Sequence, residues 1–136
     1  MEKMKLKAAI LNKRIEEIDI NPLTGALSLQ STLRMRIPGG TKGKDIQTGI
    51  AIEIPEGYYG LIMDSDQMRA RYPLHIMTTT ITSEHRGEII LNVTNYTSYP
   101  ETIELKQVIG KIVFLPIQDV DLKMVKSIKQ IKPTEE

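Results

Sequence analysis

The stretch that decides the fold is His85-Arg86-Gly87-Glu88-Ile89-Ile90-Leu91-Asn92-Val93-Thr94-Asn95. It opens with a charged turn centred on Gly87. From there every second residue, Ile89, Leu91 and Val93, is apolar, and the residues between them (Glu88, Ile90, Asn92 and Thr94) form the opposite face. This period of two predicts a half-buried strand. A glycine at the strand entrance predicts a tight turn where backbone or ligand comes close.

Similar short segments, separated by turn residues, fill most of the chain. Asp45–Ile54 alternates most regularly, and Pro55-Glu56-Gly57 predicts a turn before a return strand at Tyr58–Met63. Further strands are predicted at Leu23–Gln30, Thr32–Ile37, Leu74–Thr82, Glu101–Leu105 and Val108–Leu115. Lys3–Leu11 fits either a strand or, together with Ile15 and Ile18, a short helix. About nine or ten short strands predict an all-β barrel or sandwich.

Two segments depart from the strand pattern. Asp64-Ser65-Asp66 predicts the cap of a short helix that runs to about Arg71 and stops at Tyr72-Pro73. Pro38–Lys44 carries glycines and lysines, as phosphate-binding loops do. Its spacing is not that of a Walker loop and no helical pattern follows it, so we interpret it as a hairpin connection.

Composition narrows the classes of function. The chain has 136 residues, which is enough for one domain with a core, and its net charge of +1 gives no reason to expect nucleic acid or an anionic membrane as partner. The absence of cysteine excludes disulfides, thiolate metal sites and a cysteine nucleophile. With only His75 and His85 available, we expect no histidine-built metal site.

Hydropathy gives an expectation about location. No apolar run is long enough for a transmembrane helix, and Ala8–Leu11 is too short for the core of a signal peptide. We therefore expect a protein that is not secreted through a signal peptide and is found in the cytoplasm or in a virion.

The C-terminal segment differs from the rest. Val120, Leu122 and Met124 alternate with polar residues, and the last residues are polar. We expect a β domain over residues 1–118 and a C-terminal arm over residues 119–136. The first part of the arm fits a strand lent to a neighbouring subunit, and its last residues are expected to be mobile.

Several segments resemble, in a consistent order, the trimeric dUTP pyrophosphatases (dUTPases). Gln47–Ile62 resembles their segment TGI-x-I-x-IP-x-GYxG-x-I, Ser83–Ile89 resembles the third motif D-x-D-Y-R-G-E-I, and Ile103–Phe114 resembles the fourth motif and its approach. The resemblance covers roughly residues 23 to 117. It implies a dUTPase-like β-barrel or jelly roll (β-clip) with one or two short helices, assembled as a homotrimer.

The residues that carry the family's chemistry match less well. That family cleaves dUTP to dUMP and pyrophosphate with magnesium and a water activated by a carboxylate. The carboxylate position falls on Thr82, whose hydroxyl is too weak an acid to act as a base. The tyrosine under the deoxyribose becomes His85, and the second-motif arginine falls in Asp64-Ser65-Asp66, where two carboxylates would repel a triphosphate unless metal intervened.

The remaining motifs also differ. The first motif corresponds to Thr24–Leu29, which has no acid, and the fourth-motif glutamine becomes Lys111. No glycine follows Gly110, where the family's glycine-rich fifth motif would stand.

These departures lead to a first hypothesis of a catalytically inactive, trimeric dUTPase-like module without a cofactor. Its role would be assembly or protein interaction. Viruses and phages use the family widely, so the resemblance points to a viral or phage accessory protein or virion component, with viral or host proteins as partners.

The alternative hypothesis is a divergent dUTP-type pyrophosphatase or nucleotide-binding protein. It would use magnesium, although no residue set suggests a protein-built metal site. Glu84, or else His85, would replace the lost base, and Ser65, Arg86, Gly87 and Lys111 would bind the nucleotide. Each residue also has a structural interpretation: Glu84 as a solvated turn carboxylate near Arg86, His85 as a surface turn residue, and Lys111 as a solvent-facing strand residue.

Overall fold

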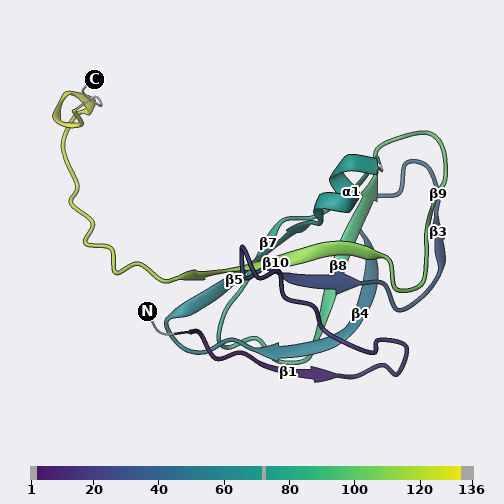
Figure 1. The fold of residues 1–136 in the computed structure, drawn as a ribbon. Helices are drawn as coiled ribbons and strands as arrows, with labels where there is room; N and C mark the ends of the chain where they lie inside the picture. The colour runs from purple at the N-terminus through teal and green to yellow at the C-terminus, as the bar shows by residue number, and fades with distance from the viewer. Residues whose placement is uncertain (1–2, 72, 133–136) are drawn as a thin grey trace.

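The protein folds into ten short strands and very little helix. The structure is a computed structural model that describes residues 3–71 and 73–132. The strands are β1 (Lys7–Ile10), β2 (Leu27–Gln30), β3 (Met35–Ile37), β4 (Lys44–Glu53), β5 (Tyr58–Asp64), β6 (Leu74–Ile76), β7 (Thr79–Ile81), β8 (Glu88–Asn95), β9 (Glu101–Ile103) and β10 (Val108–Pro116). The helices are α1 (Asp66–Arg71) and the 3-10 turn η1 (Ile128–Gln130). The predicted all-β class is confirmed (Figure 1).

The strands form two four-stranded sheets and one two-stranded sheet. The first sheet has the order β1-β4-β8-β6, the second has the order β2-β10-β5-β7, and β3 pairs with β9. Every recorded pairing is antiparallel. In such sheets one face can be buried while the other meets solvent, as the alternating sequence predicts.

The core lies where the inner faces of the two larger sheets meet. Leu29 and Ile112 of one sheet and Leu91 and Val93 of the other are fully buried in a single apolar cluster. The sheets approach so closely that a Cβ added to Gly110 of β10 would lie 3.1 Å from Cδ1 of Leu91 on β8. Interdigitation at this density makes the core sensitive to single methyl groups.

The pairing of β4 with β8 contains a bulge at Gly49. Gln47 pairs with Ile90 and Ala51 pairs with Glu88, so that three residues of β4 stand opposite Ile89. Gly49 has a φ of +75°, its N–H donates to Oε2 of Glu88 at 2.8 Å, and the buried Thr48 hydroxyl donates to the Ile89 carbonyl at 2.6 Å. These two side chains bond backbone groups that the bulge removes from the regular ladder.

Asn95, at the end of β8, holds three separate segments together. Its buried Nδ2 donates to the carbonyls of Ile37, Pro38 and Tyr99, and its Oδ1 accepts from the backbone and hydroxyl of Thr97. A side-chain amide can satisfy several backbone groups at a junction that has no regular ladder.

The predicted cap of the short helix is confirmed. The Ser65 hydroxyl accepts from Met68 N–H at 3.0 Å and donates to the Val108 carbonyl at 3.1 Å. The Ser65 carbonyl also accepts the first helical hydrogen bond, from Arg69. Because Ser65 is only 1% exposed, this capping residue also fixes α1 against β10. The predicted stop includes Tyr72, which lies outside the described residues.

Two sequence predictions about connections are wrong. The stretch Leu74–Thr82 is not one strand: β6 pairs with β8 and β7 pairs with β5, so the chain changes sheets between Ile76 and Thr79. The loop 38–44 is not a hairpin connection, because β3 pairs with β9 and β4 pairs with β1 and β8. Local alternation does not reveal which strand a segment will pair with.

The N-terminal segment and the C-terminal segment lie at the margins of the sheets. Lys3–Leu11 contains the edge strand β1, and the chain over 12–19 is irregular instead of helical. Its Glu16 carboxylate pairs with Nζ of Lys106 at 2.6 Å, and this hydrogen bond and charge lower the pKa of Glu16. After β10 the chain leaves the sheets and ends in η1, away from the body (Figure 1). The division at residue 118 stays a prediction.

We predict that Gly49→Ala lowers the free energy of unfolding by about 3 kcal/mol, because of its positive φ and because the new Cβ overpacks its surroundings. That Cβ would lie 2.7 Å from Cγ2 of Thr32 and 3.0 Å from Cβ of Asn12. Gly40→Ala is the matched control, since Gly40 has a φ of +76° with nothing within 4 Å, and should cost about 1 kcal/mol. Equal losses in denaturant unfolding would contradict the steric explanation.

We predict that Ser65→Ala lowers the free energy of unfolding by about 1.5 kcal/mol, since the helix loses its cap and the Val108 carbonyl loses its donor. Ser28→Ala serves as the control, because the Ser28 side chain makes no hydrogen bond within the described part of the chain. Thermal and denaturant unfolding measure both changes, and a Ser65→Ala variant as stable as wild type would rule out the capping role.

Candidate functional site

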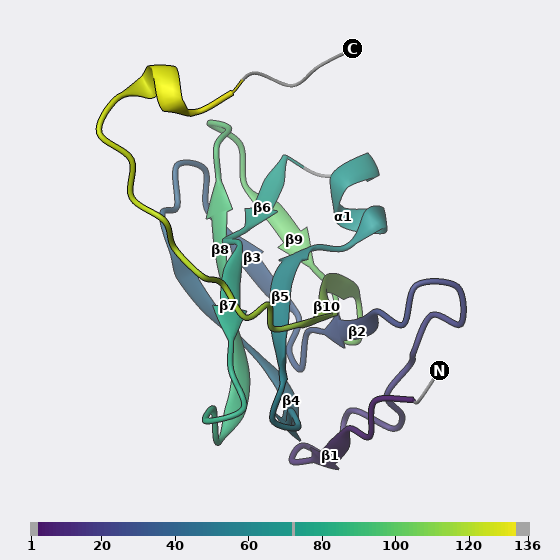
Figure 2. The ribbon, with the colours of Figure 1, turned by 90° about the vertical axis from the view of Figure 1, so that its left-hand side faces the viewer.

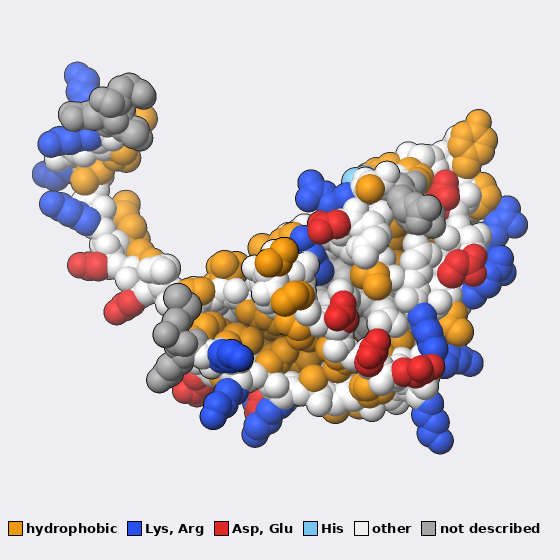
Figure 3. All heavy atoms as spheres, in the orientation of Figure 1, with side chains coloured by type: hydrophobic (Ala, Val, Ile, Leu, Met, Phe, Trp, Pro, Cys, Tyr) orange, Lys and Arg blue, Asp and Glu red, His pale blue; other side chains and the backbone are white. Residues whose placement is uncertain are grey.

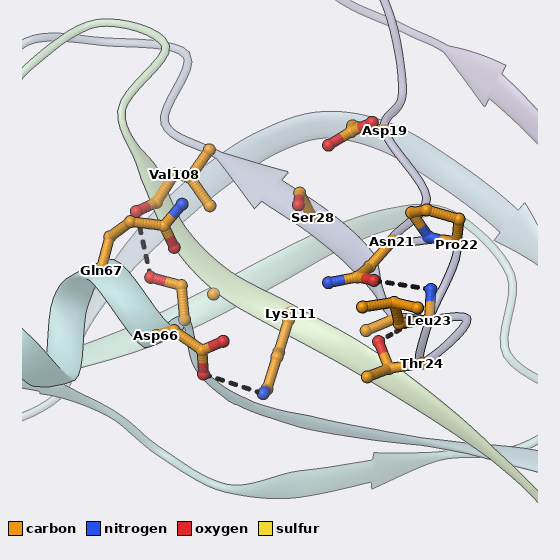
Figure 4. Close-up of a pocket in the computed structure, with 13 residues that line it drawn as sticks. Asp19, Asn21, Pro22, Leu23, Thr24, Ser28, Asp66, Gln67, Val108 and Lys111 are labelled. Atoms are coloured by element: carbon orange, nitrogen blue, oxygen red, sulfur yellow. Dashed lines mark hydrogen bonds and ion pairs between the residues drawn. The ribbon is translucent and has the colours of Figure 1, made fainter.

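A pocket of about 330 Å³ lies between the loop that precedes β2, the start of α1 and the start of β10 (Figure 4). It is lined by residues from three stretches that are far apart in the sequence: the loop and strand from Asp19 to Ser28, the helix start from Ser65 to Gln67, and the strand residues Val108, Gly110 and Lys111. The antiparallel pairing of β10 with both β2 and β5 brings these stretches together.

Two of the four predicted nucleotide-binding residues, Ser65 and Lys111, line this pocket. Nζ of Lys111 lies 3.2 Å from Oδ1 of Asp66, and Figure 4 shows the pair bridging from β10 to α1. The Lys111 side chain is 24% exposed and that of Asp66 is 80% exposed. The Ser65 hydroxyl is already occupied by its two capping hydrogen bonds. Nucleotide binding by both residues stays a prediction.

The loop that forms the opposite wall was not predicted as part of a site. Oδ1 of Asn21 accepts from Leu23 N–H at 2.8 Å, the Thr24 hydroxyl accepts from Ala26 N–H at 3.2 Å, and the N–H of Gly25 donates to the Asn21 carbonyl at 2.7 Å. Gly25 has a φ of +75°, which glycine adopts at little cost. The sequence signal was present in Asn21-Pro22 and Gly25, but it indicated only a turn.

The two acids beside Ser65 have different surroundings. Asp64 does not line the pocket: its Oδ1 accepts from Ile76 N–H at 2.6 Å and its Oδ2 lies 3.4 Å from Nδ1 of His75. Its side chain is 16% exposed, so this carboxylate mainly fixes β6 beside the end of β5. Asp66 lines the pocket, and Asp19 adds a second carboxylate there from the loop before β2.

The predicted base and sugar-binding positions lie on the turn between β7 and β8. His85 N–H donates to the Thr82 carbonyl, and Glu84 N–H donates to the Thr82 hydroxyl. The Glu84 side chain is exposed and makes no hydrogen bond or ion pair with the described residues. Nε2 of His85 is shielded from solvent and has no hydrogen-bond partner among the described residues.

Arg86 and Gly87 line a different hollow from Ser65 and Lys111. This hollow of about 270 Å³ lies beside β1 and the end of β4. Arg86 donates to the carbonyls of Ser83 and His85, and its Nη2 lies 3.5 Å from Oε1 of Glu53. Arg86 therefore holds the turn in shape and places it against β4, and Glu53, not Glu84, is its acidic partner.

Within one chain the two groups of predicted residues are far apart. Ile81 of β7 pairs with Gly60 near the start of β5, and Ser65 follows the end of β5. Five residues of extended strand correspond to about 16 Å. Figure 2 shows the same separation, with the turn after β7 at the bottom of the view and α1 near its top. The pocket and the turn do not form one site within a single chain.

A third, apolar hollow of about 790 Å³ is lined mainly by the N-terminal segment, the loop before β2, Tyr58 and Phe114. Figure 3 shows the hydrophobic side chains gathered there, beside the point where the C-terminal tail departs. The described part of the tail exposes Val120, Leu122 and Met124 by more than 70% each.

The described residues contain neither a metal-binding cluster nor a membrane-spanning helix. They contain no group of three or more His, Cys, Asp or Glu side chains placed to hold a metal ion. No helix in the described ranges is long and apolar enough to cross a membrane.

Comparison with characterised proteins gives a single family. A deoxyuridine 5'-triphosphate nucleotidohydrolase from Escherichia phage T5 is 36% identical over 85 residues, which are 62% of this chain and 56% of that protein. One from Anaplasma marginale is 28% identical over 112 residues, which are 79% of this chain and 75% of that protein. The chain thus spans just over half the length of the phage T5 relative.

Solved structures show the same fold. A mutant of the Staphylococcus bacteriophage 80alpha dUTPase, solved with dUpNHpp, superposes with a TM-score of 0.79 at 20% sequence identity over 90% of this chain and 89% of that chain. The dUTPase of phage phi11 of S. aureus superposes with a TM-score of 0.78 at 19% identity over 90% of this chain and 97% of that chain.

These relatives correct the hypothesis of an inactive assembly module. The curated relatives at 28% to 36% identity are named as nucleotidohydrolases, and nothing in the described structure indicates that catalysis has been lost. That hypothesis was based on the number of side chains in this chain that differ from the catalytic motifs of the family. A count of differing side chains does not by itself show that catalysis is lost, because other carboxylate or ammonium groups can carry out the same chemistry.

Membership of the family does not depend on these individual relatives. The dUTPase family model matches residues 25–136, which include the pocket residues from Ala26 onward, the turn after β7 and the C-terminal tail. That range also contains the pairings of β10 with β2 and with β5. This chain belongs to the dUTPase family.

Proposed function

We propose that this chain is a subunit of a dUTP nucleotidohydrolase, which cleaves dUTP between its α- and β-phosphates to give dUMP and pyrophosphate. One observation carries the proposal: a single pocket collects the stretches that correspond to the first, second and fourth dUTPase motifs, namely Thr24–Leu29, Asp64–Asp66 and the segment around Lys111. The names of the curated relatives and the dUpNHpp bound to the phage 80alpha enzyme support the same activity.

We further propose that each complete site forms between two subunits of a homotrimer. The third-motif turn with Glu84 and His85 lies at the far end of β5 from Ser65, so a neighbouring subunit must supply it. A surface for association is present, because the outer face of the second sheet carries the half-buried apolar residues Leu61 and Met63 of β5 and Val113 and Leu115 of β10. Apolar strips of this kind are typical of permanent interfaces.

The residues divide into two roles in such a site. Lys111 provides the positive charge for the phosphates, and Ser65 acts indirectly by fixing α1 beside it. From the neighbouring subunit, Arg86 and Gly87 shape the turn that meets the nucleoside. His85 stands at the position of the family's tyrosine, so we assign its ring, whose Nε2 is shielded from solvent, to packing against the sugar.

Glu84 is the proposed general base. Its carboxylate is exposed and free of protein partners in the described structure. It takes a proton from a water molecule as the water oxygen attacks phosphorus. The bond between phosphorus and the bridging oxygen breaks, and pyrophosphate leaves with the electron pair. A positioned carboxylate contributes about a hundredfold to ten-thousandfold in such a step.

The pocket fits a magnesium ion that is bound mainly by the phosphates. Mg²⁺ usually keeps several waters and takes one or two carboxylates together with substrate phosphates, instead of a protein cage. Asp66 and Asp19, the two carboxylates that line the pocket, are the residues that would hold it. When bound, the ion neutralises negative charge on the phosphates.

We predict that the purified protein converts dUTP to dUMP and pyrophosphate in the presence of Mg²⁺, and that Glu84→Gln lowers kcat at least a hundredfold. Glu56→Gln is the matched control, since Glu56 is an exposed carboxylate on the turn after β4. Pyrophosphate release measures both. Absence of turnover in the wild type would overturn the proposed function, and full turnover in Glu84→Gln would remove Glu84 as the base.

We predict that two inactive variants complement each other if the site lies between subunits. Lys111→Met removes the phosphate-binding charge that one subunit contributes to a site, and Glu84→Gln removes the base that the neighbouring subunit contributes. Co-expression in equal amounts should restore about a quarter of the wild-type rate, because that share of sites combines two intact halves. A native mass three times that of the chain should accompany this result. Complementation that fails while mixed trimers form would place both residues in one subunit's site.

A further inference from the structure

The glycine- and lysine-rich loop 38–44 does not line the pocket of the proposed nucleotide site. It lies against the chain that follows β8, because Gly40 N–H donates to the Thr97 carbonyl and Asn95 N–H donates to the Thr41 carbonyl, both at 2.9 Å. The pairing of β3 with β9, side by side in Figure 1, joins the same two connections where they meet these strands. The loop is therefore fixed at one end of the first sheet.

A hollow of about 380 Å³ opens where these two connections meet β8. It is lined by Gly40, Lys42, Thr94, Asn95 and Tyr96. This lining contains one ammonium group and no carboxylate among the described residues. The hollow thus differs from the pocket beside β2, where Asp19 and Asp66 accompany Lys111.

The Tyr96 ring is positioned by a second aromatic ring. The centroids of the Tyr96 and His75 rings lie 5.2 Å apart with an angle of 65° between the planes, which is an edge-to-face arrangement. His75 is itself placed by Asp64, whose Oδ2 lies 3.4 Å from its Nδ1. Tyr96 nevertheless stays 74% exposed, so the ring offers an ordered aromatic surface to solvent.

Lys42 adds a positive charge that no protein group neutralises. Its side chain is exposed and forms no ion pair with the described residues. The N–H groups of Lys42 and Gly43 also make no hydrogen bond within the described part of the chain, and Gly43 has a φ of +73°. Successive free N–H groups beside a residue of positive φ form a concavity that binds anions.

We propose that this hollow is a second ligand site that binds a nucleotide unit, with the base stacked on Tyr96 and the phosphate at Lys42. The ligand must combine an aromatic plane with negative charge, because the hollow presents an aromatic face beside an unpaired cation. A free nucleotide and a residue of single-stranded nucleic acid share this chemistry. The local charge matters here, and the net charge of +1 for the whole chain does not reveal it.

The proposal does not rest on the proposed hydrolase activity. The hollow and the pocket that contains Lys111 share no lining residue. A variant of Tyr96 should therefore hydrolyse dUTP at the wild-type rate. Its effect should appear only in binding at the second site.

The expected effects follow from one stacked base and one phosphate contact. We expect the wild type to bind an oligothymidylate of about ten nucleotides, and Tyr96→Ala to weaken this binding at least about tenfold. Tyr96→Phe should keep the wild-type affinity, because phenylalanine retains the aromatic plane. Lys42→Met should weaken binding and reduce the slope of log K against log salt concentration by about 0.7, the share of one phosphate contact on a single strand.

Fluorescence anisotropy of a labelled oligothymidylate, titrated with the full chain at several salt concentrations, measures these changes. Tyr99→Ala is the matched control for Tyr96, since Tyr99 is 73% exposed and does not line the hollow. Lys13→Met is the control for Lys42, since Lys13 is an exposed lysine elsewhere on the chain. Calorimetry with dTMP tests the free nucleotide, and circular dichroism checks the fold of each variant.

The outcomes decide both the site and the source of its ligand. Binding that is lost in Tyr96→Ala but kept in Tyr96→Phe and Tyr99→Ala supports the site. In that case, binding of the oligomer alone identifies single-stranded nucleic acid as the ligand, and binding of dTMP identifies a free nucleotide. Absence of binding of both probes by the wild type, or equal binding by Tyr96→Ala, overturns the proposal. Absence of dUTP turnover by the wild type would overturn the proposed function and leave this site standing.

Discussion

The bulged pairing of β4 with β8 is the constraint on which the rest of the structure depends. In a regular ladder the side chains of β4 would continue to alternate between the two faces of the sheet past Ile89. Here three residues of β4 stand opposite Ile89, and the positive φ of Gly49 accommodates the extra residues. Glu88 and Thr48 then satisfy the backbone groups that the bulge frees. The loop from Leu11 to Ile15 packs on this bulge through the Gly49 carbonyl, so the N-terminal edge of the sheet takes its position from one glycine.

The second sheet brings together the residues that line the pocket. β10 pairs with β2 on one side and with β5 on the other, and so brings the loop before β2 and the helix after β5 to the same pocket. Ser65 secures the arrangement by capping α1 and bonding Val108 at once. The antiparallel pairing of β5 with β7 places the turn with Glu84 at the opposite end of β5 from the pocket. This separation of the pocket from the turn is the observation that supports the proposed site between subunits.

The charged residues that line the pocket differ from those that the family's motifs imply. Lys111 stands where the family resemblance implies a glutamine, and its Nζ lies 3.2 Å from Oδ1 of Asp66. Substituted motif residues are thus better understood as a different distribution of charge than as evidence of lost activity.

The sequence by itself determined the strand-rich class, the inward faces of β4 and β8, and the short helix after Ser65, because alternation and capping are properties of neighbouring residues. It also indicated the family, while nucleotide binding by Ser65 and Lys111 stays a prediction. Only the tertiary structure decided that Leu74–Thr82 divides between two sheets, that Asp19 joins the pocket, and that Asp64 bonds β6 while Asp66 lines the pocket. These outcomes depend on which strands pair across long stretches of chain, and local sequence patterns carry no information about that pairing.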